Sequence, residues 1–497
     1  MARHEAEATD EKGDALDPAN YRPIASLPIL CKLFSRMILD RVGQTLDSQQ
    51  SPDQAGFRKG FSCDDDLFVV RELAGKAEEF NLPLWVVAID FQKAFDSFTH
   101  PSLWRALSNQ GVPAIYINVL QRLYQDQVGT IEAGAESRKF KILRGSRQGD
   151  PISPALFNAV LEDVMRACKS KWQSKGWGWA VSPSDCNLTN LRFADDLLLL
   201  ARSLYQAQEM LSDIITEAER VGLLVHFGKT TILHNSRGQN VRQQHVEVAG
   251  NKVKILPSYD AADYLGSKLR LTHRMEVEVN FRMARAWAKF STFRSELTSK
   301  SYNLYDRIRL FDSVVTPCAL YGCGSWALTK TEEQHIRTTQ RRMLRAILNK
   351  PRRILDPAAS DTQSTSEDAD QDQELEELGE EEQLESWVDW LKRTTKDATD
   401  ALEKVGAEDW VTVLRKRKWQ WAGRVCRHSN ERWTSKILHW KPEEGLRGVG
   451  HPRLRWQDEL NAFSKTLPGF DEDEHAWQHL LMSPESEEAL MLDFIAF

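Results

Sequence analysis

Apolar residues recur along the chain with two different periods, which together predict a protein of the α+β class. Helical spacing of apolar positions predicts helices over residues 29–46, 102–124, 155–171, 275–293, 304–315 and 332–348. Short apolar runs bounded by polar residues predict a strand that ends at Asp90 and a buried hairpin over residues 191–200. The turn of that hairpin carries Asp195 and Asp196, with four leucines directly after them.

Two adjacent carboxylates between apolar strands need a counter-charge, because like charges repel and burial removes their water. A divalent cation is the usual partner, since hard cations prefer carboxylate oxygens. An ordinary Asp-Asp turn without a metal is the alternative. Asp90 would supply a third carboxylate, and three aspartates from two strands could hold two cations about 3.5–4 Å apart. Asp96 fits equally well as the cap of a following helix.

Two glycine-containing basic loops add candidate phosphate contacts. They cover residues 54–62 (QAGFRKGFS) and 143–154 (LRGSRQGDPISP). Glycine lets the backbone approach a ligand closely, and backbone amides with nearby cations suit a phosphate. An ordinary surface turn is the alternative for residues 54–62 taken alone.

The charge of the chain is unevenly distributed. Its net charge is −7, but residues 361–385 hold twelve Asp and Glu, residues 466–497 hold eight more, and neither segment has Lys or Arg. The remainder is therefore basic, as is typical of nucleic-acid-binding proteins. The seven scattered cysteines form no C-x-x-C pair, and no signal peptide or apolar span is evident. These features predict an intracellular protein that has no contact with a membrane.

The order of the motifs resembles the polymerase of non-LTR, LINE-type retrotransposons. The motifs are NYRPIASLP (20–28), QAGFRKGFS (54–62), AIDFQKAFD (88–96), RQGDPISPALFN (147–158), FADD (193–196), GLLVHFGKT (222–230) and YLG (264–266). The resemblance covers about residues 12–270. It implies a right-hand polymerase with an antiparallel sheet in the palm, and RNA-directed DNA synthesis on an RNA template, from a DNA primer and deoxynucleoside triphosphates.

The resemblance also implies roles for individual residues. Asp90 and Asp195 would bind two Mg²⁺ ions, for which Mn²⁺ could substitute, with Asp196 supporting them and Lys229 as general acid. Phe95 would crowd the sugar 2′ position, although a core aromatic is the alternative, and Lys229 could equally be a surface lysine. The other expected nucleotide contacts are Arg22, Arg58, Gln148 and Gly149. His226 stands where the family usually has Asn.

Basic residues after the polymerase-like part are candidates for nucleic-acid binding. They are Arg337, Arg341, Arg342 and Arg345 on one predicted helix, and Arg415, Lys416, Arg417 and Lys418 beside several tryptophans. Such residues would contact phosphates and stack on bases. A small helical core packed around the tryptophans is the alternative.

The expected domain organisation has five parts. These are a frayed start of the fingers (1–20), fingers and palm (21–270), a helical thumb (271–355), an acidic disordered linker (356–385) and a helical Trp-rich basic module (386–497). No segment resembles the first fingers strand or the endonuclease domain that the full-length polyprotein would carry, so a piece of a longer polyprotein is expected. It would act in the nucleus if active. A truncated remnant that only binds nucleic acid is the alternative.

Overall fold

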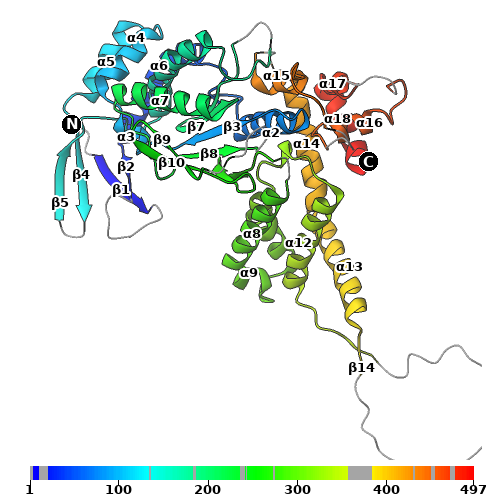
Figure 1. Ribbon diagram of the computed structural model, residues 1–497. Helices are drawn as coiled ribbons and strands as arrows, with labels where there is room; N and C mark the ends of the chain where they lie inside the picture. Colours follow the sequence, from blue (N-terminus) through cyan, green and yellow to red (C-terminus); the bar gives the residue numbers. More distant parts are fainter. Residues whose placement is uncertain are drawn as a thin grey trace, which may run out of the picture. The chain divides into compact units, whose positions relative to one another are not determined.

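The computed structural model of the chain contains two compact units, of which the first holds the sheet predicted to carry the aspartates (Figure 1). It describes residues 4–10, 21–133, 136–182, 186–235, 241, 243–272, 275–355, 383–428, 431–448, 454–470 and 476–497. The first unit takes Met1–Val277 and Trp421–Glu487, and the second takes Glu278–Gln420 and Glu488–Phe497. Helices combine with mainly antiparallel sheets, so the predicted α+β class is confirmed. The predicted domain boundaries stay predictions.

A six-stranded sheet in the order β6-β7-β3-β8-β10-β9 forms the centre of the first unit. Its neighbouring strands pair antiparallel, apart from β8 with β10. The predicted strand before Asp90 and the hairpin around Asp195 are therefore confirmed. The strand bounds are β3 Trp85–Ile89, β6 Asn190–Phe193, β7 Asp196–Ala201, β8 Thr231–His234, β9 His245–Val248 and β10 Asn251–Ile255.

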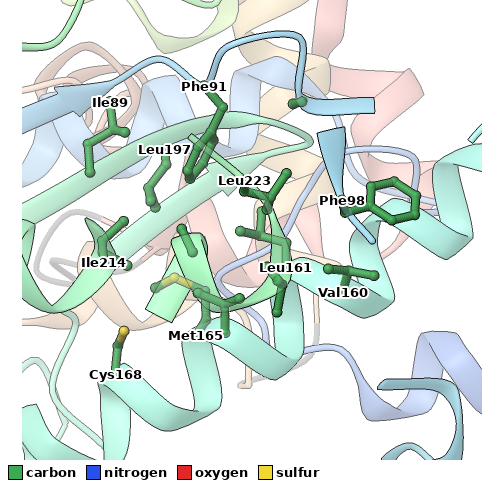
Figure 2. Close-up of a cluster of buried hydrophobic side chains, with 14 of the residues drawn as sticks. Ile89, Phe91, Phe98, Val160, Leu161, Met165, Cys168, Leu197, Ile214 and Leu223 are labelled. Atoms are coloured by element: carbon green, nitrogen blue, oxygen red, sulfur yellow. The ribbon is translucent and has the colours of Figure 1, made fainter. Parts of the chain in front are cut away.

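The core of this unit lies between the sheet and helices α6 (Ser153–Ser174) and α7 (Leu204–Val221). Figure 2 shows Ile89 and Leu197 of the sheet facing the helical residues Leu161 and Ile214. The four consecutive leucines of β7 are all fully buried, so both faces of that strand are covered. Full burial of one such side chain contributes about 1.5–3 kcal/mol, which makes β7 a strongly stabilised support for the carboxylates at its start.

Before α6, the helix predicted from residue 29 is confirmed, the helix at Cys63–Glu79 was not predicted, and the helix predicted over residues 102–124 is divided. Residues 102–124 form two helices and not one, because Gly111 at φ +78° and Pro113, which lacks an N–H, interrupt the helix. The bounds are α1 Ile29–Gln49, α2 Cys63–Glu79, α3 Ala94–Ser97, α4 His100–Asn109 and α5 Ala114–Tyr124.

A second sheet of the first unit corrects the prediction for the start of the chain. Residues 4–10 are not frayed but form a strand, β1 (His4–Asp10), which pairs antiparallel with β2 (Tyr21–Ser26) and parallel with β4 (Val128–Ala133). The sheet is completed by β5 (Glu136–Lys141). Residues 11–20 lie outside the described part. Its apolar side chains are two small alanines, Ala6 and Ala8, which alternate with Glu5 and Glu7, so pairing of the backbone contributes more to this strand than apolar burial does.

The C-terminal part of the first unit packs against α2. Phe68 of α2 contacts Trp456 and Trp421, with ring centroids 4.8 and 6.0 Å away, and Lys76 Nζ donates to the Leu438 carbonyl at 3.0 Å. Helix α15 (Trp433–His439) lies beside α2 (Figure 1), and α16 (Asp458–Ser464) and α17 (Ala476–Leu481) follow. The tryptophans here form a packed core, as the alternative interpretation proposed; Trp421, Trp456 and Trp477 are all fully buried.

The second unit is mainly helical, and its predicted helices are confirmed. The bounds, including helices that cross between units, are α8 Glu276–Thr292, α9 Arg294–Thr298, α10 Leu304–Val314, α11 Thr316–Ala319, η2 Cys323–Ser325, α12 Lys330–Leu348, α13 Trp387–Val405, α14 Trp410–Arg427 and α18 Pro484–Ala496. Most of the expected linker, residues 356–382, lies outside the described part. Its last residues differ from the prediction, because β14 (Gln383–Leu384) pairs with β13 (Ile354–Leu355). None of the helices in the described ranges is long and apolar enough to span a membrane.

A buried network of charged side chains joins β6 to α6 and to the residues before α2. The Arg192 side chain is fully buried and donates to Glu162 Oε2 at 2.8 Å, while Lys169 Nζ lies 2.5 Å from Asp53 Oδ2. The indole N–H of Trp433 donates to Asp53 Oδ1 at 2.7 Å. Burial alone would raise the pKa of Asp53, but the charges of Lys169 and Arg192 outweigh it and lower that pKa to about 2.

We expect Trp456→Ala to destabilise the chain by about 3–5 kcal/mol, because it leaves a cavity beside Phe68 in the packed core. The matched control is Trp387→Ala, whose side chain is 61% exposed and whose effect should stay within about 0.5 kcal/mol. Denaturant unfolding measures both. Equal effects of the two substitutions would contradict the packing of the C-terminal part described above.

We also expect Asp53→Asn to flatten the acid dependence of stability. Because the pKa of Asp53 falls from its usual 3.8 to about 2 on folding, its ionised form adds about 2 kcal/mol of stability above pH 4. That contribution is lost as the pH falls from about 4 to about 2. Urea unfolding at a series of pH values should show a smaller change for Asp53→Asn than for the wild type, while Asp493→Asn at an exposed position should follow the wild type. Parallel curves for Asp53→Asn and the wild type would contradict this assignment.

Candidate active site

The ends of two neighbouring strands bring the predicted carboxylates to one edge of the central sheet. Asp90 directly follows β3, and Asp195 lies in the turn before Asp196 begins β7. The two strands pair antiparallel with Ile89 opposite Leu197. Continuing this register by one residue sets Asp90 opposite Asp196, and opposed residues of an antiparallel pair share a face.

A loop that includes the predicted general acid runs beside Asp90. The amide of His226 donates to the Asp90 carbonyl at 2.7 Å, and the Lys229 amide donates to the His226 carbonyl at 3.0 Å, which closes a turn despite the unusual histidine. This turn brings Lys229 Nζ within 3.8 Å of Asp90 Oδ2. Both side chains are partly exposed, at 60% for Lys229 and 38% for Asp90, so solvent and a substrate can reach them.

The predicted YLG turn also lies close to the carboxylates. Tyr264 ends β11 (Ala262–Tyr264), which forms a hairpin with β12 (Ser267–Leu269). Its hydroxyl donates to Asp66 Oδ2 of helix α2 at 3.1 Å. Burial raises the pKa of Tyr264 well above its usual 10, and the nearby carboxylates of Asp66 and Asp196 raise it further.

The donor set at this edge suits Mg²⁺. In the ranges that the structure describes, no three His, Cys, Asp or Glu side chains are arranged to enclose a metal ion. Mg²⁺ at sites of phosphate chemistry is usually bound by one or two carboxylates together with waters and substrate phosphates. Carboxylates at the adjacent ends of β3 and β7 fit that pattern, and the Asp90 side chain is 38% exposed.

Phe95 lies in a small aromatic group next to these strands. Its ring stacks on Phe157 at 4.5 Å between centroids and meets Phe57 edge-on at 6.0 Å. The side chain is only half-buried, so one part of it packs in the core and another faces outward. The core role and the expected contact with a sugar are thus compatible.

Gln148 and Gly149 join this region to the second sheet. The carbonyl of Gln148 accepts from the Ala25 amide at 3.0 Å, and its side chain donates to Asp96 Oδ2 at 3.0 Å. Gly149 has φ +98°, a conformation that favours glycine, and an added Cβ would press against the Ala25 carbonyl. Residues 148–149 therefore link β2 to the segment after Asp90.

Of the two arginines predicted to contact a nucleotide from the fingers, Arg22 and Arg58, the structure describes the side chain of Arg58. Arg22 belongs to β2, but its side chain lies outside the described part. The Arg58 guanidinium donates to Asp47 Oδ1 at 2.7 Å and to the carbonyls of Ser51 and Gln54 at 3.0 and 3.1 Å. With its side chain only 12% exposed, Arg58 primarily stabilises the loop around it. Its contact with a nucleotide stays a prediction.

The predicted nucleic-acid contacts of the second unit fall into two groups. On α12, Arg341 is half-buried, Arg342 is exposed, Arg337 pairs with Asp409, and Arg345 donates to Thr395 Oγ1. On α14, Arg415 lies 3.6 Å from Glu333, Lys416 pairs with Glu408, and Arg417 donates to the Leu320 carbonyl. Lys418 is buried, so its side chain is not available to a phosphate in this structure.

The residue that supports the turn before Asp195 was not identified from the sequence. Gln54 hydrogen-bonds both the amide and the carbonyl of Ala194, the residue before Asp195. The sequence of residues 54–62 predicts a phosphate-binding loop or an ordinary surface turn. No local sequence pattern around Gln54 indicates that its side chain contacts a residue 140 positions further along the chain.

Comparison with known proteins identifies the family of the chain. Residues 10–269, more than half of the chain, match the family model for "Reverse transcriptase (RNA-dependent DNA polymerase)". The chain is 33% identical over 190 residues to an R2 retrotransposon Pol polyprotein of Popillia japonica, covering 38% of this chain and 26% of that one. It is 25% identical over 350 residues to "Probable RNA-directed DNA polymerase from transposon X-element" of Drosophila melanogaster, covering 68% of this chain and 36% of that one.

Two further comparisons cover larger shares of the matched proteins. A transposon-derived protein of Caenorhabditis elegans, described as uncharacterized, is 27% identical over 277 residues, which make up 55% of this chain and 84% of that protein. Among solved structures, apo telomerase of Candida tropicalis matches with a TM-score of 0.40 and 10% identity, over 87% of this chain and 69% of that one. The chain thus spans about a quarter of the R2 polyprotein and about a third of the X-element protein. With residues 10–269 matched throughout, the chain belongs to the reverse transcriptase family, and its relatives include the non-LTR retrotransposon polymerases expected from its motifs.

Proposed function

We propose that the chain is an RNA-directed DNA polymerase that extends a DNA primer on an RNA template by two-metal nucleotidyl transfer. The observation that carries this proposal is the pairing of β3 with β7, which brings the end of one strand and the start of the other to the same edge of the sheet. Asp90, Asp195 and Asp196 would hold two Mg²⁺ ions there, with Mn²⁺ as a possible substitute. When bound, the ions lower the pKa of the primer 3′-hydroxyl and neutralise charge on the leaving pyrophosphate.

The residues around the carboxylates would orient the substrate and supply a proton. Lys229, whose Nζ lies 3.8 Å from Asp90 Oδ2, would protonate the pyrophosphate as it leaves. Phe95 would exclude a 2′-hydroxyl, because its ring is fixed by a stacked contact with Phe157 and an edge-on contact with Phe57. Gln148 and Gly149 would lie against the templating base and the new base pair, while Arg22 and Arg58 would contact the triphosphate or template.

Nucleic acid would be bound mainly through phosphate contacts that do not depend on sequence. The arginines of α12 (Arg337, Arg341, Arg342 and Arg345) and Arg415, Lys416 and Arg417 of α14 are the proposed contacts. Lys418 is not among the proposed contacts, because its side chain is buried. The substrates would be an RNA template, a DNA primer and deoxynucleoside triphosphates. The primer end would be made at a nick cut by another domain or protein in the nucleus.

Removing a single carboxylate should abolish most of the activity. Asp90→Asn and Asp195→Asn should each lower the rate of primer extension on RNA by roughly 10³-fold, because a bound metal supplies several kcal/mol of charge stabilisation. Asp493→Asn, at an exposed position of α18, is the matched control and should retain full activity. The proposal would be contradicted if the wild type extends primers and both the Asp90→Asn and the Asp195→Asn variants extend them equally well. An inactive wild type that still binds RNA in a salt-dependent manner would favour a binding protein instead.

Phe95→Ala should admit ribonucleotides. We expect the ratio of kcat/KM for ribonucleotides to that for deoxyribonucleotides to rise by roughly 10²-fold, the scale on which a shaped pocket discriminates a single hydroxyl. Single-nucleotide incorporation measures this ratio. Phe463→Ala, at a buried aromatic of α16, should lower stability and leave the ratio unchanged. An equal shift of the ratio in both variants would show that Phe95 acts only through packing.

A further inference from the structure

We propose that Gln54 is a positioning residue that fixes the turn carrying Asp195 and Asp196 through hydrogen bonds to the Ala194 peptide groups. This inference rests on the proposed function, because it assigns a role within the same site. It gives the loop at residues 53–56, which we call the clamp loop, a task that differs from the phosphate contact expected from its sequence.

The catalytic turn contains a backbone conformation that needs support. Ala194 has φ +59°, which brings the Cβ of a non-glycine residue close to the following carbonyl oxygen. Such conformations persist where the surrounding structure determines them strongly, and they concentrate at functional sites. Ala194 is also buried, with only 4% of its surface exposed, so its backbone polar groups need partners other than water.

Gln54 supplies those partners with one side chain. Its Nε2 donates to the Ala194 carbonyl at 3.3 Å, and its Oε1 accepts from the Ala194 amide at 2.9 Å and from the Gly56 amide at 2.8 Å. Two backbone N–H groups can meet only an oxygen, so the orientation of the side-chain amide is fixed. Gln54 is fully buried, which makes these bonds strong relative to exposed ones.

The backbone of the clamp loop holds the same strand directly. The Ala55 amide donates to the Arg192 carbonyl at 2.8 Å, and the Arg192 amide donates to the Asp53 carbonyl at 2.7 Å. Gly56 lies so close to the turn that an added Cβ would overlap the Ala194 backbone nitrogen. The loop thus contacts the hairpin over the three residues that precede Asp195.

The clamp loop is in turn fixed from behind. Asp53 accepts hydrogen bonds from Lys169, Asn190 and Trp433, at 2.5, 3.2 and 2.7 Å. The Gly56 carbonyl accepts from Asn158 Nδ2 at 2.9 Å. Contacts from α6, β6 and the C-terminal part of the first unit therefore converge on a loop of four residues. A rigid support of this kind holds ligands in place before the metal binds, as outer partners do at other metal sites.

The experiment compares Gln54→Met with the matched control Gln110→Met in the full chain. Gln110 is another buried glutamine, whose side chain donates to the Ala159 carbonyl at 2.7 Å and accepts from Gln50 Nε2 at 3.3 Å. Both partners lie outside the clamp loop and the hairpin. We expect Gln54→Met to raise the Mn²⁺ concentration at half-saturation, followed by Mn²⁺ paramagnetic resonance, by roughly 10–100-fold. The amide of Ala194 should also exchange with solvent faster. Gln110→Met should lower thermal stability similarly and change neither quantity.

The outcomes separate the clamp from the proposed function. Equal Mn²⁺ affinity and unchanged exchange at Ala194 in Gln54→Met would overturn the clamp, even if the wild type extends primers. An inactive wild type with the expected difference between the two variants would support the clamp and remove the polymerase proposal. If Gln54→Met does not fold, Gln54→Asn takes its place, since it stays neutral and its side chain is one methylene group shorter. In the wild type itself, exchange at Ala194 as fast as in an exposed turn would also overturn the clamp.

Discussion

The antiparallel pairing of β3 with β7 sets the position of each carboxylate in the proposed site. Ile89 lies opposite Leu197, and a shift of this register by one residue would turn every side chain of β7 to the other face. The leucines of β7 are fully buried on both faces, so such a shift would exchange the two sets of packed side chains, break their fit and be strongly disfavoured. Apolar burial therefore fixes where the charged residues stand, although the charges themselves oppose close approach.

Buried charges behind the hairpin add specificity to this arrangement. Arg192 is fully buried within a network that includes Glu162 and Asp53, and desolvation of such groups offsets much of their mutual attraction. These charged groups contribute mainly to structural specificity, because their hydrogen bonds form only when β6, α6 and the clamp loop are in their observed positions. The lowered pKa of Asp53 shows that its positive neighbours outweigh burial. The same network thus joins the support of the hairpin to the C-terminal part of the first unit through Trp433.

Local patterns predicted the elements that carry the candidate site, while long-range contacts escaped prediction. The strand before Asp90 and the hairpin at Asp195 follow from apolar runs that are visible within ten residues. The break at Gly111 and Pro113 was equally local, but the continuing helical period on both sides concealed it. In contrast, β1 depends on backbone pairing with β2 and β4, which lie further along the chain. Lys418 is buried, although the alternation of basic and aromatic residues around it predicted an exposed side chain. The role of Gln54 depends on a contact between segments far apart in sequence.

A nucleotidyl-transfer site has to place carboxylates close together before any cation neutralises them. A turn held only by its own two strands would relax under that repulsion, because turn backbones exchange easily among conformations. A buried glutamine that meets both polar groups of Ala194 removes this freedom without adding a charge next to Asp195. An arginine or lysine in its place would stabilise the carboxylates without metal and compete with the ions for them. A neutral amide is therefore the side chain that supports the turn and leaves its charge available to a metal.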